Sequence, residues 1–353
     1  MLNEPPNIPL INPTPHAALL VLPRLRVQNA NAISSPLTWG FPSITAFTGF
    51  MAALSRRLGT AADIRFQSVG VVCHGFEAQV TQGGYTRSFS LTRNPILQDG
   101  ATAAIVEEGR VHLDITLVFE VQLSSALLND AARADCAAQI AEWVAGMRIA
   151  GGSVMPPVSG TLRQPPRSKL VLLAEAPDLR AQQFKRLCRQ WLPGFALVSR
   201  DDLLHSRLET LRANAPDAQP RPTLLDAWLD LSRINYRAST TTVWNAAGDA
   251  STEAVEWAPD PRPGWLVPIP VGYTALSELH PSGAVASARD TDTPFQFVES
   301  VYSIGQWISP HRLDDVAQLT WRPEHTPATG LYRCANAYQA PATDTYTPVT
   351  FTD

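Results

Sequence analysis

A short segment near the start of the chain carries side chains suited to binding an anionic ligand that bears bases. Positions 23–42 hold two arginines, two asparagines, two serines and a Trp-Gly-Phe sequence, but no carboxylate and no lysine. Guanidinium groups pair with phosphates, amides and hydroxyls bond to base edges, and aromatic rings stack on bases. The candidate binding residues are Arg24, Arg26, Asn29, Asn31, Ser34, Ser35 and Trp39. The alternative is that Asn and Ser close turns, with Trp39 and Phe41 packed beneath them.

Two later sites could serve the same role. Gly151 and Gly152 follow an expected helix, where glycines either bring backbone amides close to a phosphate or cap the helix. His311 and Arg312 lie in a Ser-Pro-His-Arg sequence. Arg312 could bond to a base edge or to an internal carboxylate, so this pair is either RNA-contacting or structural.

Seven histidines raise the question of ribonuclease chemistry, which needs a base near the 2′-hydroxyl and often a Tyr or Lys beside it. No histidine is paired with a lysine, and Lys169 and Lys185 are the two lysines of the chain. The sequence has no Walker loop, no HExxH, no GxSxG and no carboxylate pair at metal spacing. We therefore expect no enzymatic activity.

The composition is that of a globular protein. The 353 residues are 45% hydrophobic and 17% charged, enough for a large core in one or two domains. No apolar run approaches the ~18–20 residues of a membrane span, and the first residues lack the order of a signal peptide, so a cytoplasmic location is expected. The four cysteines, at 73, 136, 188 and 334, form no pairwise motif. This pattern predicts neither a metal site nor a cofactor and fits a reducing compartment.

The charge is unevenly distributed along the chain, although its net value is only −4. Residues 17–98 hold seven arginines and two acids, whereas residues 200–260 hold six arginines and ten acids. A basic first part suits a protein that holds one defined RNA segment, and an acidic part is available for protein partners. Arginine supplies 26 of the 28 basic residues. This bias favours phosphate contacts, but a GC-rich genome would also produce it.

Apolar spacing predicts the elements that position the first candidate segment. An apolar run at 17–22 predicts a strand, 23–42 a long polar loop, and the residues between Ser43 and Gly59 a helix. Further strands are expected at 64–80 and at 111–121, the second with strict alternation.

A hairpin is expected around Gly83-Gly84, between the two later strands. Its returning strand carries Arg87, and Arg93 and Asn94 lie in the adjoining loop. These three residues are candidate phosphate or base contacts, and the alternative is a solvated hairpin tip.

The second half contains further regular elements. A helix over 131–149 leads to a proline-rich joint near 156–166. The pattern then predicts a strand at 169–173, a helix with an apolar stripe through 184–192, a strand at 195–198, helices near 201–213 and 223–236, and a strand at 265–270 whose prolines suit a sheet edge. Residues 238–262 are expected to form a flexible loop, 1–16 a flexible arm and 341–353 a disordered tail.

Long stretches of the sequence resemble the second Csy subunits of type I-F CRISPR surveillance complexes (Cascade). They follow in the same order over roughly 17–335, at 23–42, 46–50, 72–79, 94–95, 102–110, 150–153, 192–200, 263–270 and 309–312. The resemblance implies an α+β protein of the RAMP group. It implies an RRM-like (ferredoxin-like) core at 17–160 with an inserted β-hairpin thumb near 76–105, and an elaborated second half at 161–340.

The resemblance also implies a function in antiviral defence. Such a subunit is non-catalytic, binds the 5′ handle of the CRISPR RNA, pairs with the large subunit and touches the first subunit of the repeated backbone, at the end of the complex that inspects double-stranded target DNA. Aromatic residues are missing from the outward positions of 111–121, so loops and thumb, rather than a standard RRM sheet face, are expected to contact RNA. The alternatives are a structural adaptor with incidental RNA contact and a CRISPR RNA processing endoribonuclease.

Overall fold

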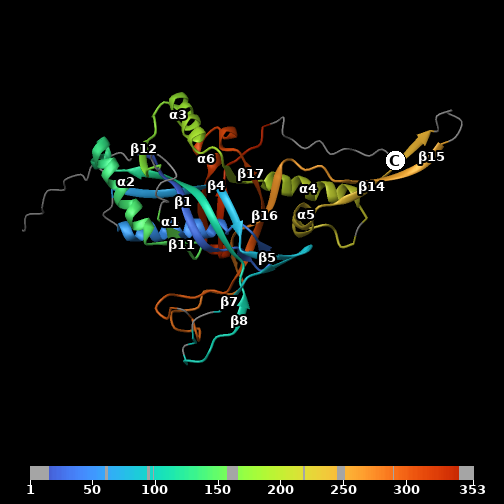
Figure 1. Cartoon of the computed structure of the whole chain (residues 1–353), viewed down its shortest axis with the longest axis horizontal. Helices are drawn as coiled ribbons and strands as arrows, with labels where there is room; N and C mark the ends of the chain where they lie inside the picture. The colour runs from blue at the N-terminus through green and yellow to red at the C-terminus, as the bar shows by residue number, and fades with distance from the viewer. Residues whose placement is uncertain are drawn as a thin grey trace, which may run out of the picture.

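The computed structural model describes residues 16–59, 63–93, 96–97, 99–156, 166–217, 219–244, 251–288 and 290–341. It confirms the predicted α+β class, with a large sheet and helices packed on it (Figure 1). The predicted arm at 1–16 and tail at 341–353 lie outside the described residues, except for His16 and Pro341. None of the helices in the described part of the chain combines the length and the apolar character that a transmembrane span requires.

Eleven strands of the described residues form one sheet, in the order β10-β11-β1-β9-β4-β13-β17-β16-β19-β18, with β12 also paired to β1. Their bounds are β1 His16–Asn31, β4 Ile64–Ala78, β9 Arg110–Leu123, β10 Arg148–Ile149, β11 Gly152–Met155, β12 Lys169–Leu172, β13 Phe195–Ser199, β16 Trp265–Ala275, β17 Val298–Ile308, β18 Thr320–Thr326 and β19 Leu331–Asn336. The sheet is continuous through both halves of the chain, because β4 pairs with β13 and with β18.

The first half has the connectivity of a ferredoxin-like unit. Strand β1, helix α1 (Ile44–Leu58), strands β4 and β9, helix α2 (Asp130–Ala145) and strand β11 follow in the order β-α-β-β-α-β, with β11, β1, β9 and β4 side by side. The predicted caps of α1 are confirmed: the Ser43 side chain accepts a hydrogen bond from the Thr45 amide, and Gly59 follows the helix with φ +83°.

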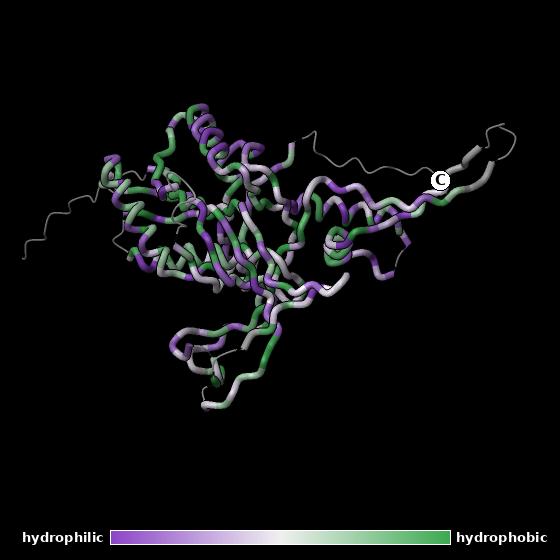
Figure 2. Tube along the Cα trace, in the orientation of Figure 1, coloured by the Kyte–Doolittle hydropathy of each residue, from purple (hydrophilic) through white to green (hydrophobic). Residues whose placement is uncertain are grey.

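The remaining helices belong to the second half. They are α3 Pro177–Gln190, α4 Asp201–Asn214, α5 Leu224–Ser232 and α6 Val316–Leu319, with short 3₁₀ turns η2 Pro310–Arg312 and η3 Pro327–Thr329. A further 3₁₀ turn, η1 Ser125–Leu127, precedes α2 in the first half. Helices α4 and α5 pack together against β16 and β17. Helix α3 is largely hydrophilic along its outer turns (Figure 2).

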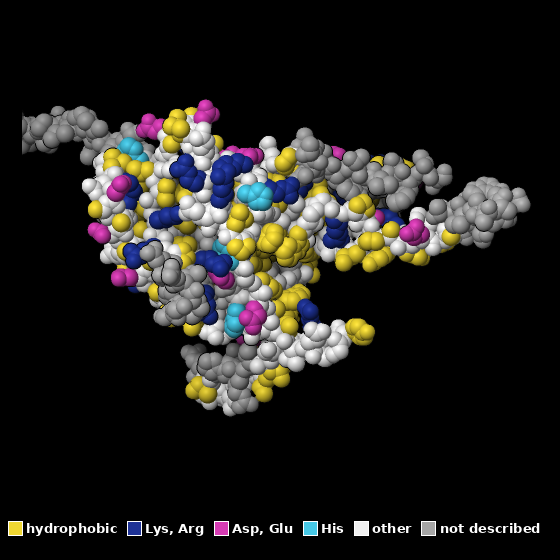
Figure 3. Space-filling model, turned by 45° about the horizontal axis from the view of Figure 1, so that its top comes forward, with side chains coloured by type: hydrophobic (Ala, Val, Ile, Leu, Met, Phe, Trp, Pro, Cys, Tyr) yellow, Lys and Arg dark blue, Asp and Glu magenta, His cyan; other side chains and the backbone are white. Residues whose placement is uncertain are grey.

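Small hairpins extend from this body. They are β2 Ile33–Ser35 with β3 Thr38–Trp39, β5 Val80–Gly83 with β6 Thr86–Phe89, β7 Leu91–Arg93 with β8 Ile105–Glu107, and β14 Tyr236–Trp244 with β15 Ser251–Pro259. The hairpin predicted around Gly83-Gly84 is confirmed. The β7–β8 pair projects at the lower side of the molecule and the β14–β15 ribbon at one end (Figures 1 and 3).

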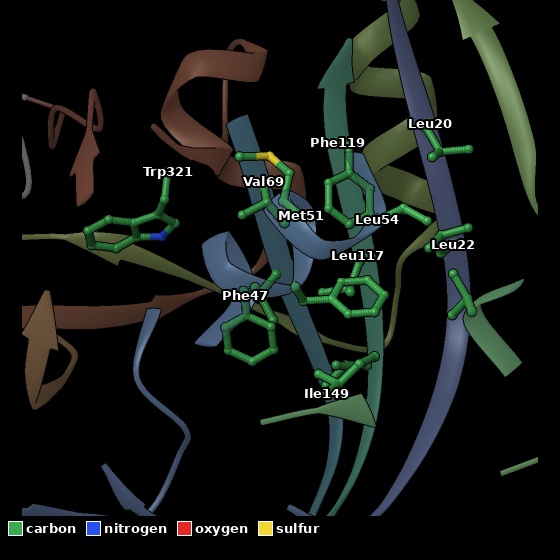
Figure 4. Close-up of a cluster of buried hydrophobic side chains, with 14 of the residues drawn as sticks. Leu20, Leu22, Phe47, Met51, Leu54, Val69, Leu117, Phe119, Ile149 and Trp321 are labelled. Atoms are coloured by element: carbon green, nitrogen blue, oxygen red, sulfur yellow. The ribbon is translucent and has the colours of Figure 1, made fainter. Parts of the chain in front are cut away.

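The core lies on both faces of the first strands. On β1, Leu20 and Leu22 point toward α1 and α2, and Leu19 and Val21 toward α3. Figure 4 shows Leu20, Leu22, Phe47, Leu54 and Phe119 in the first of these clusters. Because α3 covers part of the sheet face opposite α1, that part is unavailable as an RRM-type binding platform.

Three predicted elements are wrong in part. Residues 23–31 are not loop but the second half of β1. Helix α2 ends at Ala145 instead of 149, because a tight β10–β11 hairpin follows it. Within the predicted loop at 238–262, the described residues up to 244 and from 251 to 259 are paired strands, since β14 and β15 pair from Tyr236↔Pro259 to Trp244↔Ser251. Their threonines and valines favour a paired strand.

Candidate nucleic-acid interface

Two bulges interrupt β1 at the candidate segment. The register against β9 shifts between Leu22 and Leu25 and again between Val27 and Ala30. Each bulge contains a residue with positive φ, Arg24 at +53° and Asn29 at +58°. Bulges redirect side chains and free backbone groups from the ladder, so the sequence predicted as loop is a distorted strand.

Side chains of β9 satisfy the amides that the bulges free. The Arg24 amide donates to Thr116 Oγ1 at 3.2 Å, and the Asn29 amide donates to His112 Nδ1 at 3.1 Å. His74 on β4 extends the first contact, with Nε2 2.8 Å from Thr116 Oγ1 and Nδ1 2.7 Å from the Pro193 carbonyl oxygen. A carbonyl can only accept, so Nδ1 carries the proton and Thr116 donates to Nε2.

The donation from Thr116 holds for the neutral imidazole, which the surroundings of His74 favour. Burial lowers the pKa of His74 and nearby Arg24 lowers it further, while the Pro193 carbonyl and Asp114 act in the opposite direction. Gly194 permits the contact, because a Cβ there would lie 2.7 Å from His74 Nδ1. Residues of β1, β4, β9 and the turn after α3 together fix the backbone at Arg24.

The two arginines of this segment are exposed and differ in their partners. Arg24 Nη1 lies 3.4 Å from Asp114 Oδ2 in a half-exposed ion pair, which contributes little stability in water. No hydrogen bond or ion pair joins the Arg26 guanidinium to another of the described residues. Arg26 is therefore the better placed of the two to bind a phosphate.

A groove of about 930 Å³ runs beside these arginines. Its lining contains the basic residues Arg24, Arg26, Arg133, Arg167 and Lys169, together with the acids Asp114, Asp130 and Asp135. Arg133 and Asp130 form an ion pair with each other, which leaves the rest of the groove with a basic excess.

A second hollow, of about 430 Å³, lies on the sheet next to Arg26 and is lined by β1, β4 and β9. It contains Phe76, whose side chain is 45% exposed, beside Gln28 and His112. Phe76 belongs to the strand predicted at 64–80, and the apolar pattern of that segment does not show its exposure. In the sheet it pairs with Leu113 near the end of β4. An exposed ring in a hollow that Arg26 also lines is a suitable surface for a stacked base.

The polar residues after β1 hold a turn together. The Asn31 side chain accepts from the Ile33 amide at 3.1 Å and donates to the Ile33 carbonyl at 2.8 Å. The hydroxyls of Ser34 and Ser35 lie 2.8 and 2.7 Å from Thr38 Oγ1, and Ser35 is buried. These groups are engaged within the β2–β3 hairpin, as the turn alternative expects, so an RNA contact from them stays a prediction.

The aromatic residues of the segment have separate roles. Phe41 packs into the core, 5.6 Å from Phe47 and 4.9 Å from Trp307 between ring centroids. Trp39 is 53% exposed, and its ring meets that of Phe89 on β6 edge-on, with 5.6 Å between centroids. Trp39 thus connects the β2–β3 hairpin to the β5–β6 hairpin.

The candidate residues of the predicted thumb, Arg87, Arg93 and Asn94, are described only in part. Arg87 is exposed on β6, opposite Gln82. Arg93 ends β7, but its side chain and all of Asn94 lie outside the described residues.

The two glycines do not cap a helix, since the cap of α2 is Gly146. Gly151 turns the β10–β11 hairpin with φ +77°. Gly152 is buried, and a Cβ there would lie 2.7 Å from the Ala30 amide nitrogen and from the Gln28 carbonyl oxygen. The close backbone approach expected of Gly152 therefore occurs, but toward β1 of the same chain.

His311 and Arg312 lie apart from the bulged segment, in η2, which packs against α3. His311 Nδ1 is 2.8 Å from Ser309 Oγ. Both side chains are exposed next to the outer face of α3.

Two cysteines of the described residues have weakly acidic thiols. Burial raises the pKa of the Cys73 thiol to about 11 and that of Cys188 to about 12, so both remain protonated and unreactive near neutral pH. No three His, Cys, Asp or Glu side chains gather into a metal-binding group within the described ranges.

Comparison with known proteins shows similarity over almost the whole chain. A family model described as CRISPR-associated protein (Cas_Csy2) matches residues 20–334. The CRISPR-associated protein Csy2 of Pseudomonas aeruginosa (strain UCBPP-PA14) is 49% identical over 318 residues, covering 90% of this chain and 94% of that protein.

Proposed function

Since this chain belongs to the Csy2 family of CRISPR-associated proteins, we propose that it is a non-catalytic subunit of a type I-F CRISPR Cascade complex that binds the 5′ handle of the CRISPR RNA. Its place is in cytoplasmic antiviral defence, at the end of the complex where double-stranded target DNA is inspected. Its neighbours there are the large subunit and the first backbone subunit.

The observation that carries this proposal is the bulged half of β1. The bulges present Arg24 and Arg26 at two adjoining hollows, one with further basic residues and one with the exposed ring of Phe76. Guanidinium groups fix the phosphates of a single strand, and a ring stacks on an unpaired base. Strands β1 and β4 bring both kinds of contact to one hollow of the sheet.

The neighbouring residues have supporting roles in this proposal. Asn29 directs the second bulge, while Asn31, Ser34 and Ser35 set the shape of the β2–β3 hairpin. Trp39 contacts Phe89 of the β5–β6 hairpin, and Arg87 and Arg93 are further candidate RNA contacts.

Filter binding of handle RNA to the reconstituted complex tests this function. We expect Arg26→Gln, and separately Arg24→Ala/Asn31→Ala, to weaken RNA binding several-fold. The matched control is Arg56→Gln, which removes the same charge from the exposed end of α1, on the other face of the sheet. RNA affinity equal to wild type in both site variants would contradict the proposal.

A second candidate function is that of a structural adaptor bound to the large subunit, and the β14–β15 ribbon supports it. Cross-strand pairing places Tyr236, Val255 and Trp257 on one face of the ribbon, where all three are exposed. Leu225 and Leu229 of α5 are exposed as well. An isolated two-stranded ribbon is marginally stable in water, so an apolar face of this kind suits protein docking.

Co-purification with the large subunit tests the adaptor function. Val255→Ser/Trp257→Ser should reduce recovery of the heterodimer, whereas Ala258→Ser, on the opposite face of the same ribbon, should not. Undiminished recovery with the double variant would count against docking at this ribbon. The third possibility, a processing endoribonuclease, predicts cleavage of repeat RNA in EDTA, and we expect none.

A further inference from the structure

The outer face of α3 is basic. The inner face buries Phe184, Leu187 and Cys188 against the sheet, and the outer positions carry Arg180, Lys185, Arg186 and Arg189, with Asp178 as the one acid of the helix. Lys and Arg side chains gather on this face of the molecule with few acids among them (Figure 3). This concentration contrasts with the net charge of −4 for the whole chain.

The basic side chains of this helical face differ in whether they have partners. Lys185 Nζ lies 2.7 Å from Asp314 Oδ1, and Arg180 Nε donates to the Ala174 carbonyl at 2.8 Å. Arg186 and Arg189 are exposed, and no hydrogen bond or ion pair joins the side chain of either to another of the described residues. Both guanidinium groups are therefore available to a ligand.

The face continues toward the groove beside β1. Lys169 on β12 donates to the Gln190 side chain at the end of α3. Lys169 and Arg167 also line the groove that contains Arg26. We name Arg167, Lys169, Arg186 and Arg189 the α3 basic face; Arg167 and Lys169 are shared with the groove of the proposed RNA site, whereas Arg186 and Arg189 lie outside its lining.

We propose that the α3 basic face binds phosphates of double-stranded DNA. The exposed positions of Pro177–Gln190 carry no aromatic ring that could stack on an unpaired base, which disfavours a single strand. Arg186 and Arg189 are neighbours on the helix surface, about 5–6 Å apart between Cβ atoms. They can neutralise phosphates without reading sequence. The inference rests on the proposed function, because the guided complex is what brings duplex DNA to this face.

The test uses the reconstituted complex with its guide RNA and a fluorescent duplex DNA that has no match to the guide, titrated between 50 and 200 mM salt. We expect Arg186→Gln and Arg189→Gln each to make the slope of log affinity against log salt less negative by about 1, and the double variant by about 2. Arg56→Gln, on the other face of the sheet, should leave the slope unchanged. Arg186→Lys/Arg189→Lys, which keeps the charge, should bind nearly as the wild type does.

Each outcome separates the inference from the proposed function. Guide RNA retained by the double variant together with a reduced DNA slope supports the α3 basic face. An unchanged slope and affinity overturns the inference and leaves the RNA function standing. Loss of guide RNA instead of DNA would show that the face belongs to the RNA site, which also overturns it. If Arg26→Gln and Arg24→Ala/Asn31→Ala both leave RNA binding intact, the proposed function fails independently of the DNA measurement.

Discussion

The amide of Arg24 and the hydroxyl of Thr116 are joined across neighbouring strands, with nitrogen and oxygen 3.2 Å apart. Thr116 is 1% exposed, and its hydroxyl also lies 2.8 Å from His74 Nε2. One buried hydroxyl therefore serves both the first bulge of β1 and the imidazole of β4. The position of an exposed, candidate RNA-binding arginine depends on this interior contact.

Removal of the Thr116 hydroxyl should destabilise the fold. Thr116→Val keeps the shape but leaves the Arg24 amide and His74 Nε2 without this partner, and we expect the free energy of unfolding to fall by about 1–3 kcal/mol. Urea unfolding of the full chain measures it. Thr116→Ser restores the hydroxyl and should be less affected. A Val variant as stable as the Ser variant would show that the hydroxyl contributes little.

Gly152 should tolerate no side chain. In Gly152→Ala the new Cβ would meet backbone atoms of Gln28 and Ala30, which cannot move without displacing β1, so we expect a loss of about 1–3 kcal/mol or more in urea unfolding. Gly151→Asn is the control, because position 151 is open and Asn accepts a positive φ. Equal stability of the two variants would contradict this close packing.

Elements with strong local signals were predictable from the sequence. Helix α1 has a capping Ser43, a terminal Gly59 and apolar residues at helical spacing, and it forms where predicted. Strand β9 alternates strictly and is a central strand. In these elements the local preference and the tertiary packing agree.

The candidate site was less predictable, because distant residues determine its geometry. Pro23, Arg24 and Asn29 favour a loop locally, yet the bulges become part of a strand through contacts with Thr116 and His112, 92 and 83 residues away in the chain. The hollow shared by Phe76 and Arg26 likewise depends on the pairing of β4 and β1 with β9. A periodicity in one segment contains no information about such partners.

His74 should make stability depend on pH. Its pKa in the folded protein is lowered chiefly by burial, so the unfolded chain, with a pKa near ~6.5, binds the proton more readily. The stability that neutral His74 contributes is complete above pH ~7.5. It decreases as the pH falls below the pKa of the unfolded chain and through the lower pKa of the folded protein. Urea unfolding between pH 8 and 5.5 should therefore show a steeper loss in wild type than in His74→Gln. His205→Gln, at an exposed position on α4, should retain the wild-type profile; the same profile in all three proteins would contradict this role.

Phe76 should contribute to RNA binding through its ring. Stacking of one base on an aromatic side chain is worth about 1–3 kcal/mol, so Phe76→Leu in the reconstituted complex should weaken handle RNA binding by roughly 5- to 150-fold. Because the position is exposed, we expect little change in the stability of the fold, and urea unfolding checks this. Phe76→Tyr keeps the ring and should bind as the wild type does. If Leu binds as well as Tyr, no base stacks in the hollow beside Arg26, and the arginines alone must hold the RNA there.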